Sequence, residues 1–124
     1  MILIDTTVWV DHLRDGDAEL VRILERGQAL AHPWVTGELA LGRLRDRACI
    51  LRLLDQLPQA TLATAGELLG FIERHELFGL GIGYVDAQLL ASTVLTEDAK
   101  LLTRDRQLHA AAERLSLAHA ATPD

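Results

Sequence analysis

Four acidic residues stand where a short apolar segment or a helix could bring them to one edge of a sheet: Asp5, Glu38, Asp86 and Asp105. Ligands of open α/β sheets bind at the carboxyl ends of the strands. Four carboxylates gathered there would repel one another unless a cation lay between them, and an all-oxygen ligand set favours Mg²⁺ or Mn²⁺. Such a site can lower the pKa of a water and stabilise charge in phosphodiester hydrolysis.

Each acid also has a structural interpretation that the sequence leaves open. Asp5 and Asp105 each follow an apolar segment and could be helix N-caps, which contribute about 1 kcal/mol. Asp86 lies in the first turn of an expected helix, where a carboxylate interacts favourably with the helix dipole. Glu38 is inside a helix and could be a solvated surface residue, although Trp34 and Leu41 share its face.

The surrounding pattern predicts an α/β fold with a mainly parallel central sheet flanked by helices, built as a single domain over residues 1–124. Apolar segments predict strands at 1–4, 28–32 and 100–103, with weaker candidates at 59–63 and 115–118. Amphipathic periodicity and end signals predict helices at 6–13, 18–26, 33–45, 46–56, 64–75, 84–96 and 106–114. The residues after about 120 are expected to be loose.

Composition narrows the class of protein. The single cysteine, Cys49, excludes an intrachain disulfide and a cysteine-based zinc site. Apolar runs fall short of the roughly 18 residues that cross a membrane, and no signal peptide is recognisable, so we expect a cytoplasmic protein without membrane contact. The net charge of −6 argues against nucleic-acid binding unless a metal neutralises the acids locally.

The motifs around the four acids resemble those of the PIN-domain ribonucleases, and in particular the VapC-type toxins of bacterial toxin–antitoxin pairs. The opening ILIDTTVWVDHLR resembles the segment that carries the first acid of that family. VTGELALG, GYVDAQLLAS and LLTRDRQL resemble the segments of the second, third and fourth acids, in the same order. The resemblance covers essentially the whole chain and implies a PIN-like α/β/α fold.

The same resemblance implies a metal-dependent endoribonuclease that cleaves structured RNA, commonly transfer or ribosomal RNA. Asp5, Glu38, Asp86 and Asp105 would form the catalytic site for one or two Mg²⁺ or Mn²⁺ ions, with Thr6 and Thr103 ordering it by hydrogen bonds. It also implies a homodimer and a cognate VapB-type antitoxin whose C-terminal segment covers and inhibits the site.

Arginines near these motifs are candidates for RNA contact. Eleven of the twelve basic residues are arginine, which suits bidentate phosphate binding. Arg104 and Arg106 flank Asp105, and Arg43 lies near the end of the helix that carries Glu38. A solvated helix end is the alternative for Arg43, where arginine also favours the dipole.

Two other classes of function are alternatives to the ribonuclease. A catalytically silent binding module could keep a PIN fold. A phosphotransfer or phosphatase domain on a similar sheet is the other alternative. A receiver domain would need a lysine near the end of a late strand, but Lys100, the only lysine, is at the start of its strand. Thr7 occupies the position at which a dehalogenase-like phosphatase would have its second aspartate.

Overall fold

The computed structural model describes residues 1–120, which form seven helices and one three-stranded sheet. The elements in chain order are β1 (Ile2–Ile4), α1 (Thr6–Asp15), α2 (Ala18–Glu25), β2 (Ala29–Leu30), α3 (Pro33–Ala40), α4 (Arg47–Gln56), α5 (Ala65–Arg74), α6 (Tyr84–Leu95), β3 (Lys100–Leu102) and α7 (Arg106–Arg114).

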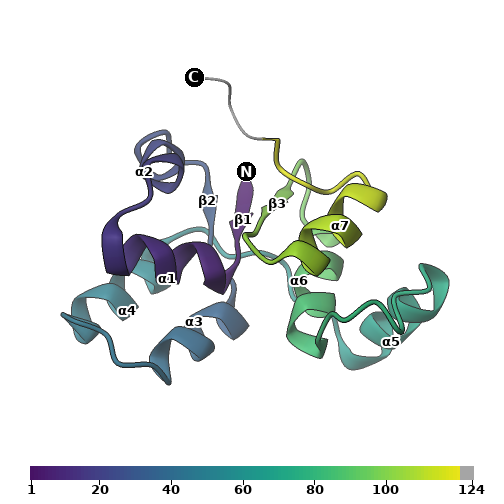
Figure 1. Cartoon of the computed structure of the whole chain (residues 1–124). Coiled ribbons are helices and arrows are strands. Elements are labelled where there is room, and N and C mark those ends of the chain that lie inside the picture. The colour runs from purple at the N-terminus through teal and green to yellow at the C-terminus, as the bar shows by residue number, and fades with distance from the viewer. Residues whose placement is uncertain (121–124) are drawn as a thin grey trace.

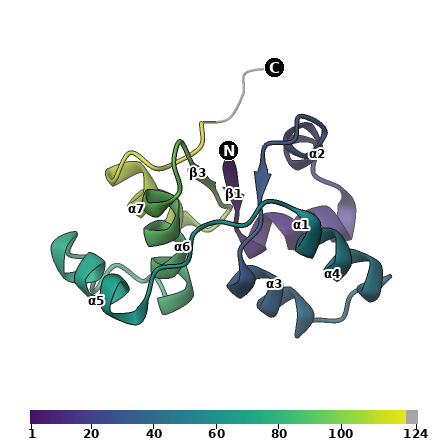
Figure 2. The same ribbon diagram turned by 180° about the vertical axis from the view of Figure 1, so that it is seen from behind.

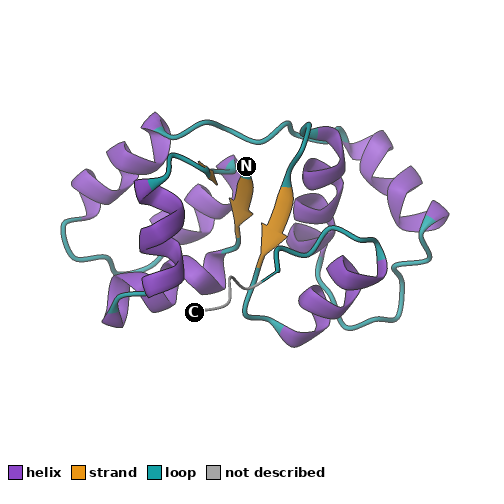
Figure 3. Cartoon of the chain, turned by 90° about the horizontal axis from the view of Figure 1, so that it is seen from above, coloured by secondary structure: helices purple, strands orange, loops and turns teal. Residues whose placement is uncertain are grey.

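All three strands of the sheet are parallel, in the order β2-β1-β3. The sheet stands between two groups of helices, with α1 to α4 on one side and α5 to α7 on the other (Figures 1 and 2). The view from above shows the same arrangement (Figure 3). The predicted α/β/α class with a parallel central sheet is therefore confirmed.

The short strands are apolar because both of their faces are covered by helices. Leu3 and Ile4 of β1 and Leu101 of β3 are completely buried. Each helix contributes an apolar stripe to the same core, and the fully buried members include Val8, Leu20, Leu54, Leu68, Leu89, Leu90 and Leu108. This core holds β1 and β3 rigidly, so residues at their carboxyl ends have fixed positions.

The register of β1 and β3 determines what meets at that edge. Ile4 pairs with Leu102, and the Asp5 amide donates to the Leu102 carbonyl at 3.0 Å. Because the strands are parallel, Asp5 and Thr103 leave the sheet side by side.

Apart from small shifts at the ends of other elements, one helix and two strand candidates differ from the sequence-based expectation. The helix predicted over 33–45 ends at Ala40, because the amides of Leu41 and Gly42 turn back to carbonyls of the last helical turn. The candidates at 59–63 and 115–118 are not strands but isolated bridges, Ala31 with Gln59 and Leu101 with Ala118. The expectation of a loose end concerns residues 121–124, which lie outside the described residues.

No helix within residues 1–120 is long and apolar enough to cross a membrane.

Candidate active site

Asp5 occupies the N-cap position of α1 but does not cap it. Its backbone is extended, and its carboxylate makes no hydrogen bond to the first amides of the helix. Instead, Oδ2 accepts hydrogen bonds from the hydroxyls of Thr103 at 2.7 Å and Thr7 at 2.8 Å. The residue is only 4% exposed. Burying a carboxylate without partners is costly, and these two donated bonds offset part of that cost.

The two hydroxyls are oriented by the segment that follows β3. The backbone amide of Arg104 donates to Thr7 Oγ1, and that of Asp105 donates to Thr103 Oγ1, both at 3.0 Å. Each hydroxyl therefore accepts from the backbone and has its one proton free for Asp5. Both bonds fall on Oδ2, so within residues 1–120 the second oxygen, Oδ1, has no hydrogen-bond donor.

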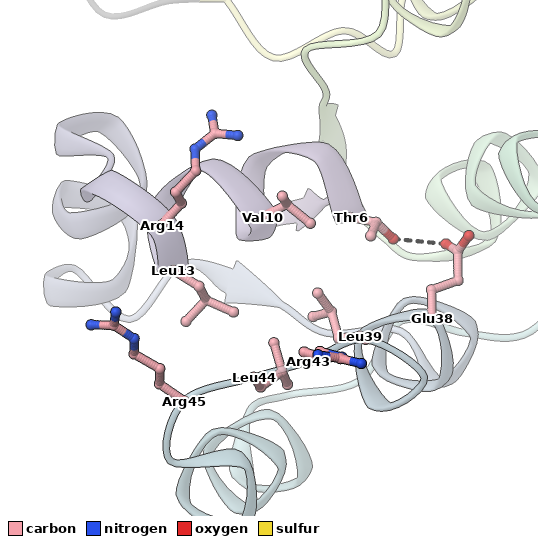
Figure 4. A pocket seen from close by; sticks show the side chains of 10 residues that line it. Thr6, Val10, Leu13, Arg14, Glu38, Leu39, Arg43, Leu44 and Arg45 are labelled. Atoms are coloured by element: carbon pink, nitrogen blue, oxygen red, sulfur yellow. Dashed lines mark hydrogen bonds between the residues drawn. The ribbon is translucent and has the colours of Figure 1, made fainter.

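Glu38 reaches the site from α3. Its Oε1 accepts a hydrogen bond from Thr6 Oγ1 at 2.7 Å, which joins α3 to the first residue of α1 (Figure 4). Glu38 itself is exposed, and Leu41, expected to share its face, is 91% exposed. The apolar neighbours inferred from the sequence therefore do not bury this carboxylate, and the Thr6 hydroxyl fixes it instead.

Asp86 belongs to the first turn of α6, and its Oδ2 accepts from the Gly83 amide at 3.0 Å. Burial is the main reason that the pKa of the Asp86 carboxyl is raised above its ordinary value, although the bond from Gly83 opposes the rise. Coulomb repulsion from three further carboxylates raises it more: Asp5, Asp105 and Glu38. All four predicted acids thus lie near enough for their charges to act at one place.

Asp105 is the N-cap of α7, as one of the two interpretations predicted. Its Oδ1 accepts from the Leu108 amide at 2.9 Å. The side chain is half-buried and its charge acts on Asp86. Capping and membership of the acid cluster are therefore compatible, because the cap uses only one of the two carboxylate oxygens.

The cluster suits a divalent cation by its donor chemistry. It offers carboxylate oxygens from four elements, with Asp5 Oδ1 free of other donors, and a cation would relieve the repulsion that acts on Asp86. Within residues 1–120, no three His, Cys, Asp or Glu side chains lie close enough together to form a finished cage. Small movements of the side chains toward an ion would be needed, with water completing the shell, as is usual for Mg²⁺.

The three arginines named from the sequence lie in different surroundings. The Arg104 guanidinium pairs with Asp17 at 2.9 Å and Glu19 at 3.5 Å, so its charge is already matched by α2 and its connection. Arg106 is exposed at the first position of α7. Arg43 follows α3 and lines a groove that begins at Glu38 (Figure 4).

The comparisons with known proteins agree with this geometry. The model of the PIN domain family matches residues 2–114. The chain belongs to the PIN-domain family, as a VapC-type member. Two curated relatives are both named Ribonuclease VapC32, from the CDC 1551 / Oshkosh and ATCC 25618 / H37Rv strains of Mycobacterium tuberculosis. Each is 48% identical over 111 residues, which cover 90% of this chain and 90% of the relative.

The sequence did not identify two features of this VapC-type site. Thr7 binds Asp5 as closely as Thr103 does, and the only local signal is a hydroxyl two residues after the acid. The second feature is a buried chain of hydrogen bonds formed by His32, Ser92 and Gln88, which joins α3 to α6. Its members are separated by up to 60 positions, so no sequence spacing predicts it.

Proposed function

We propose that this VapC-type chain is a metal-dependent endoribonuclease toxin that hydrolyses phosphodiester bonds in structured RNA, either transfer or ribosomal RNA. The observation that supports it most is electrostatic. At the carboxyl edge of a parallel sheet, the charges of Asp5, Glu38 and Asp105 all act on the carboxylate of Asp86. Without a cation, the carboxylates repel one another. With a divalent cation, the same carboxylates form a site that can catalyse phosphodiester hydrolysis.

Asp5, Glu38, Asp86 and Asp105 would hold one or two Mg²⁺ or Mn²⁺ ions, with Asp5 and Asp86 as the firmest ligands. When bound, the metal supplies a water of lowered pKa and stabilises charge on the attacking and leaving oxygens. The chain's own hydroxyls do the positioning. Thr7 and Thr103 fix Asp5, and Thr6 fixes Glu38, so the ligand oxygens need little reorganisation.

The proposal includes the partners that the family implies: a cognate VapB-type antitoxin that covers and inhibits the site, and a second copy of the chain. Exposed apolar side chains on α5, in the loop that follows it and at the start of α6 support the homodimer, because Leu69, Phe78 and Tyr84 are 58%, 61% and 50% exposed. We place the toxin in the cytoplasm, where both RNA classes are found.

Cleavage of total bacterial RNA by purified, antitoxin-free protein tests the proposal. We expect discrete fragments with Mn²⁺, none with EDTA and none for Asp5→Asn. Asp55→Asn, on the exposed face of α4, removes the same charge away from the site and should cleave as the wild type does.

Wild-type cleavage by a folded Asp5→Asn variant, or equal cleavage in EDTA, would refute the proposal. If folded protein cleaves nothing, a metal titration on the same sample decides between two outcomes. Bound metal would call for a different RNA pool. No binding at millimolar Mn²⁺ would favour the silent binding module.

A further inference from the structure

A groove of about 480 Å³ begins at Glu38, one of the four acids, and passes between α1 and the end of α3 (Figure 4). Thr6 and Glu38, joined by their hydrogen bond, close the end nearest the cluster. The floor is apolar and consists of Val10, Leu13, Leu39 and Leu44. Val10 is 44% exposed, so apolar surface is open to solvent here although the core lies directly beneath.

Two arginines with unmatched charge border this floor. Arg43 and Arg45 come from the turn that follows α3, and both are exposed. Among residues 1–120, neither has a carboxylate within salt-bridge distance. A third arginine of the groove, Arg14, differs because it bonds Asp11 and Asp15 and points away from the floor in Figure 4.

These arginines supply positive charge beside a negatively charged site. The chain carries a net charge of −6, and four of its carboxylates lie together at the site. Their negative potential repels any polyanion that approaches it. In Figure 4, Arg45 lies at the end of the groove away from Glu38, and Arg43 lies between them. A polyanion that leaves the acid cluster along the groove would therefore meet two guanidinium groups in turn.

We propose that the groove binds a single-stranded segment of RNA next to the scissile phosphate, with Arg43 and Arg45 contacting its backbone and the floor covering a base. This inference rests on the proposed ribonuclease function. A nucleotide joins an apolar base face to an anionic phosphate, and the groove presents the matching pair of surfaces. Arginine binds phosphate oxygens through two parallel N–H donors, and burial of a base face on Leu13 and Leu44 adds affinity without sequence selectivity.

An acidic amphipathic peptide also combines apolar and anionic groups. Two observations favour RNA. The groove is continuous with Glu38, where a cleaved strand must pass, and the unmatched charges follow one another along it as phosphates do along a strand.

The first experiment measures binding of a short fluorescein-labelled single-stranded RNA of mixed sequence by fluorescence anisotropy with Mg²⁺ present. Every variant carries Asp5→Asn to prevent cleavage. We expect Arg43→Gln with Arg45→Gln to weaken binding about tenfold and to reduce the slope of log K against log salt by about 0.7 for each lost phosphate contact. Leu44→Ala should weaken binding without changing the slope, because it removes apolar contact only.

Arg26→Gln with Arg74→Gln is the matched control, since it removes two exposed arginines outside the groove. Its affinity for RNA should fall only slightly, because the variant loses two positive charges but no contact in the groove. The proposal fails if the Arg43 and Arg45 variant keeps its parent's affinity and salt slope. Loss of antitoxin binding with RNA binding intact would likewise overturn it and assign the groove to a protein partner.

Cleavage separates failure of this inference from failure of the proposed function. With Asp5 restored, the Arg43→Gln, Arg45→Gln protein should cleave with a raised KM and an almost unchanged kcat. Metal-dependent cleavage with unchanged KM would refute the groove proposal and leave the ribonuclease in place. If the folded wild type neither cleaves RNA nor binds Mn²⁺ at millimolar concentration, both proposals fail.

Discussion

His32 and Ser92, 60 positions apart in the chain, are hydrogen-bonded in the core, with His32 Nε2 3.0 Å from Ser92 Oγ. His32 is the N-cap of α3, and its Nδ1 accepts the Trp34 amide at 3.0 Å. The neutral ring therefore carries its proton on Nε2 and donates it to Ser92. Ser92 donates in turn to Gln88 at 3.0 Å. Both of the latter residues belong to α6, so this chain of bonds connects the helix of Glu38 to the helix of Asp86.

Ser92→Ala should destabilise the protein by about 1–3 kcal/mol, because it leaves the buried Nε2 proton of His32 without an acceptor. It should also lower the cleavage rate by loosening the link between α3 and α6. Urea unfolding and cleavage under the same conditions measure the two effects. Thr93→Val is the control, since it removes a neighbouring buried hydroxyl that bonds only within its own helix, to the Leu89 carbonyl. Equal effects of the two variants would exclude a special role for the link.

Stability should decrease in acid because of His32. Burial lowers the pKa of this imidazole from 6.5 to about 4. Between pH 6.5 and pH 4, His32 is therefore protonated in the unfolded chain but neutral in the folded chain. The free energy of unfolding is therefore unaffected by this group above pH 6.5, and it decreases as the pH falls toward 4. The shift corresponds to about 3 kcal/mol.

Urea unfolding across this pH range measures the effect as the difference between wild type and His32→Asn. Asparagine can still cap α3 through its side-chain oxygen but does not titrate. A stability difference that stays constant from pH 7 to pH 4 would contradict the assignment.

The sequence predicted those parts of this molecule that depend on local patterns. Apolar strands, end signals and helical periodicity were enough to place β1, β3 and the helices, because the chain buries its strands on both faces and covers them with amphipathic helices. The position of Asp105 after a strand favours a cap as one of two interpretations, and the bond from Leu108 confirms that cap. Asp5 has the same local signal but makes no side-chain cap, because its carboxylate bonds Thr7 and Thr103 instead.

Contacts between distant segments could not be predicted in the same way. The end of α3 at Ala40 is an exception, because Gly42 is a poor helix former and gives a local signal for the turn whose amides return to the helix. Thr7 and Asp5 are only two positions apart, but the Thr7 hydroxyl is oriented by the Arg104 amide, which comes from the distant segment after β3. The polar chain through His32 requires the packing of α6 against the end of β2, which no single segment encodes.

Thr103→Val should reduce divalent-metal affinity about 10–100-fold, because it removes one of the two hydrogen bonds that hold Asp5 in place. The hydroxyl also accepts the Asp105 amide, so the segment that leads into α7 loses an anchor at the same time. A Mn²⁺ titration followed by calorimetry measures the affinity. Thr103→Ser keeps the hydroxyl and should recover most of it. If serine and valine were equally weak, shape rather than hydrogen bonding would explain the role of Thr103.

Asp105 allows its two roles to be separated, because one oxygen caps α7 while the charge acts on the acid cluster. Asp105→Asn keeps a good N-cap, so we expect its unfolding free energy to stay close to that of the wild type while metal-dependent cleavage falls. Asp105→Ala should lose cleavage and, in addition, about 1 kcal/mol of stability. In EDTA no metal contributes to stability, and both variants lack the charge, so the difference in unfolding free energy between Asp105→Asn and Asp105→Ala reports the cap. Full cleavage by Asp105→Asn would restrict this residue to its structural role and leave three acids to bind the metal.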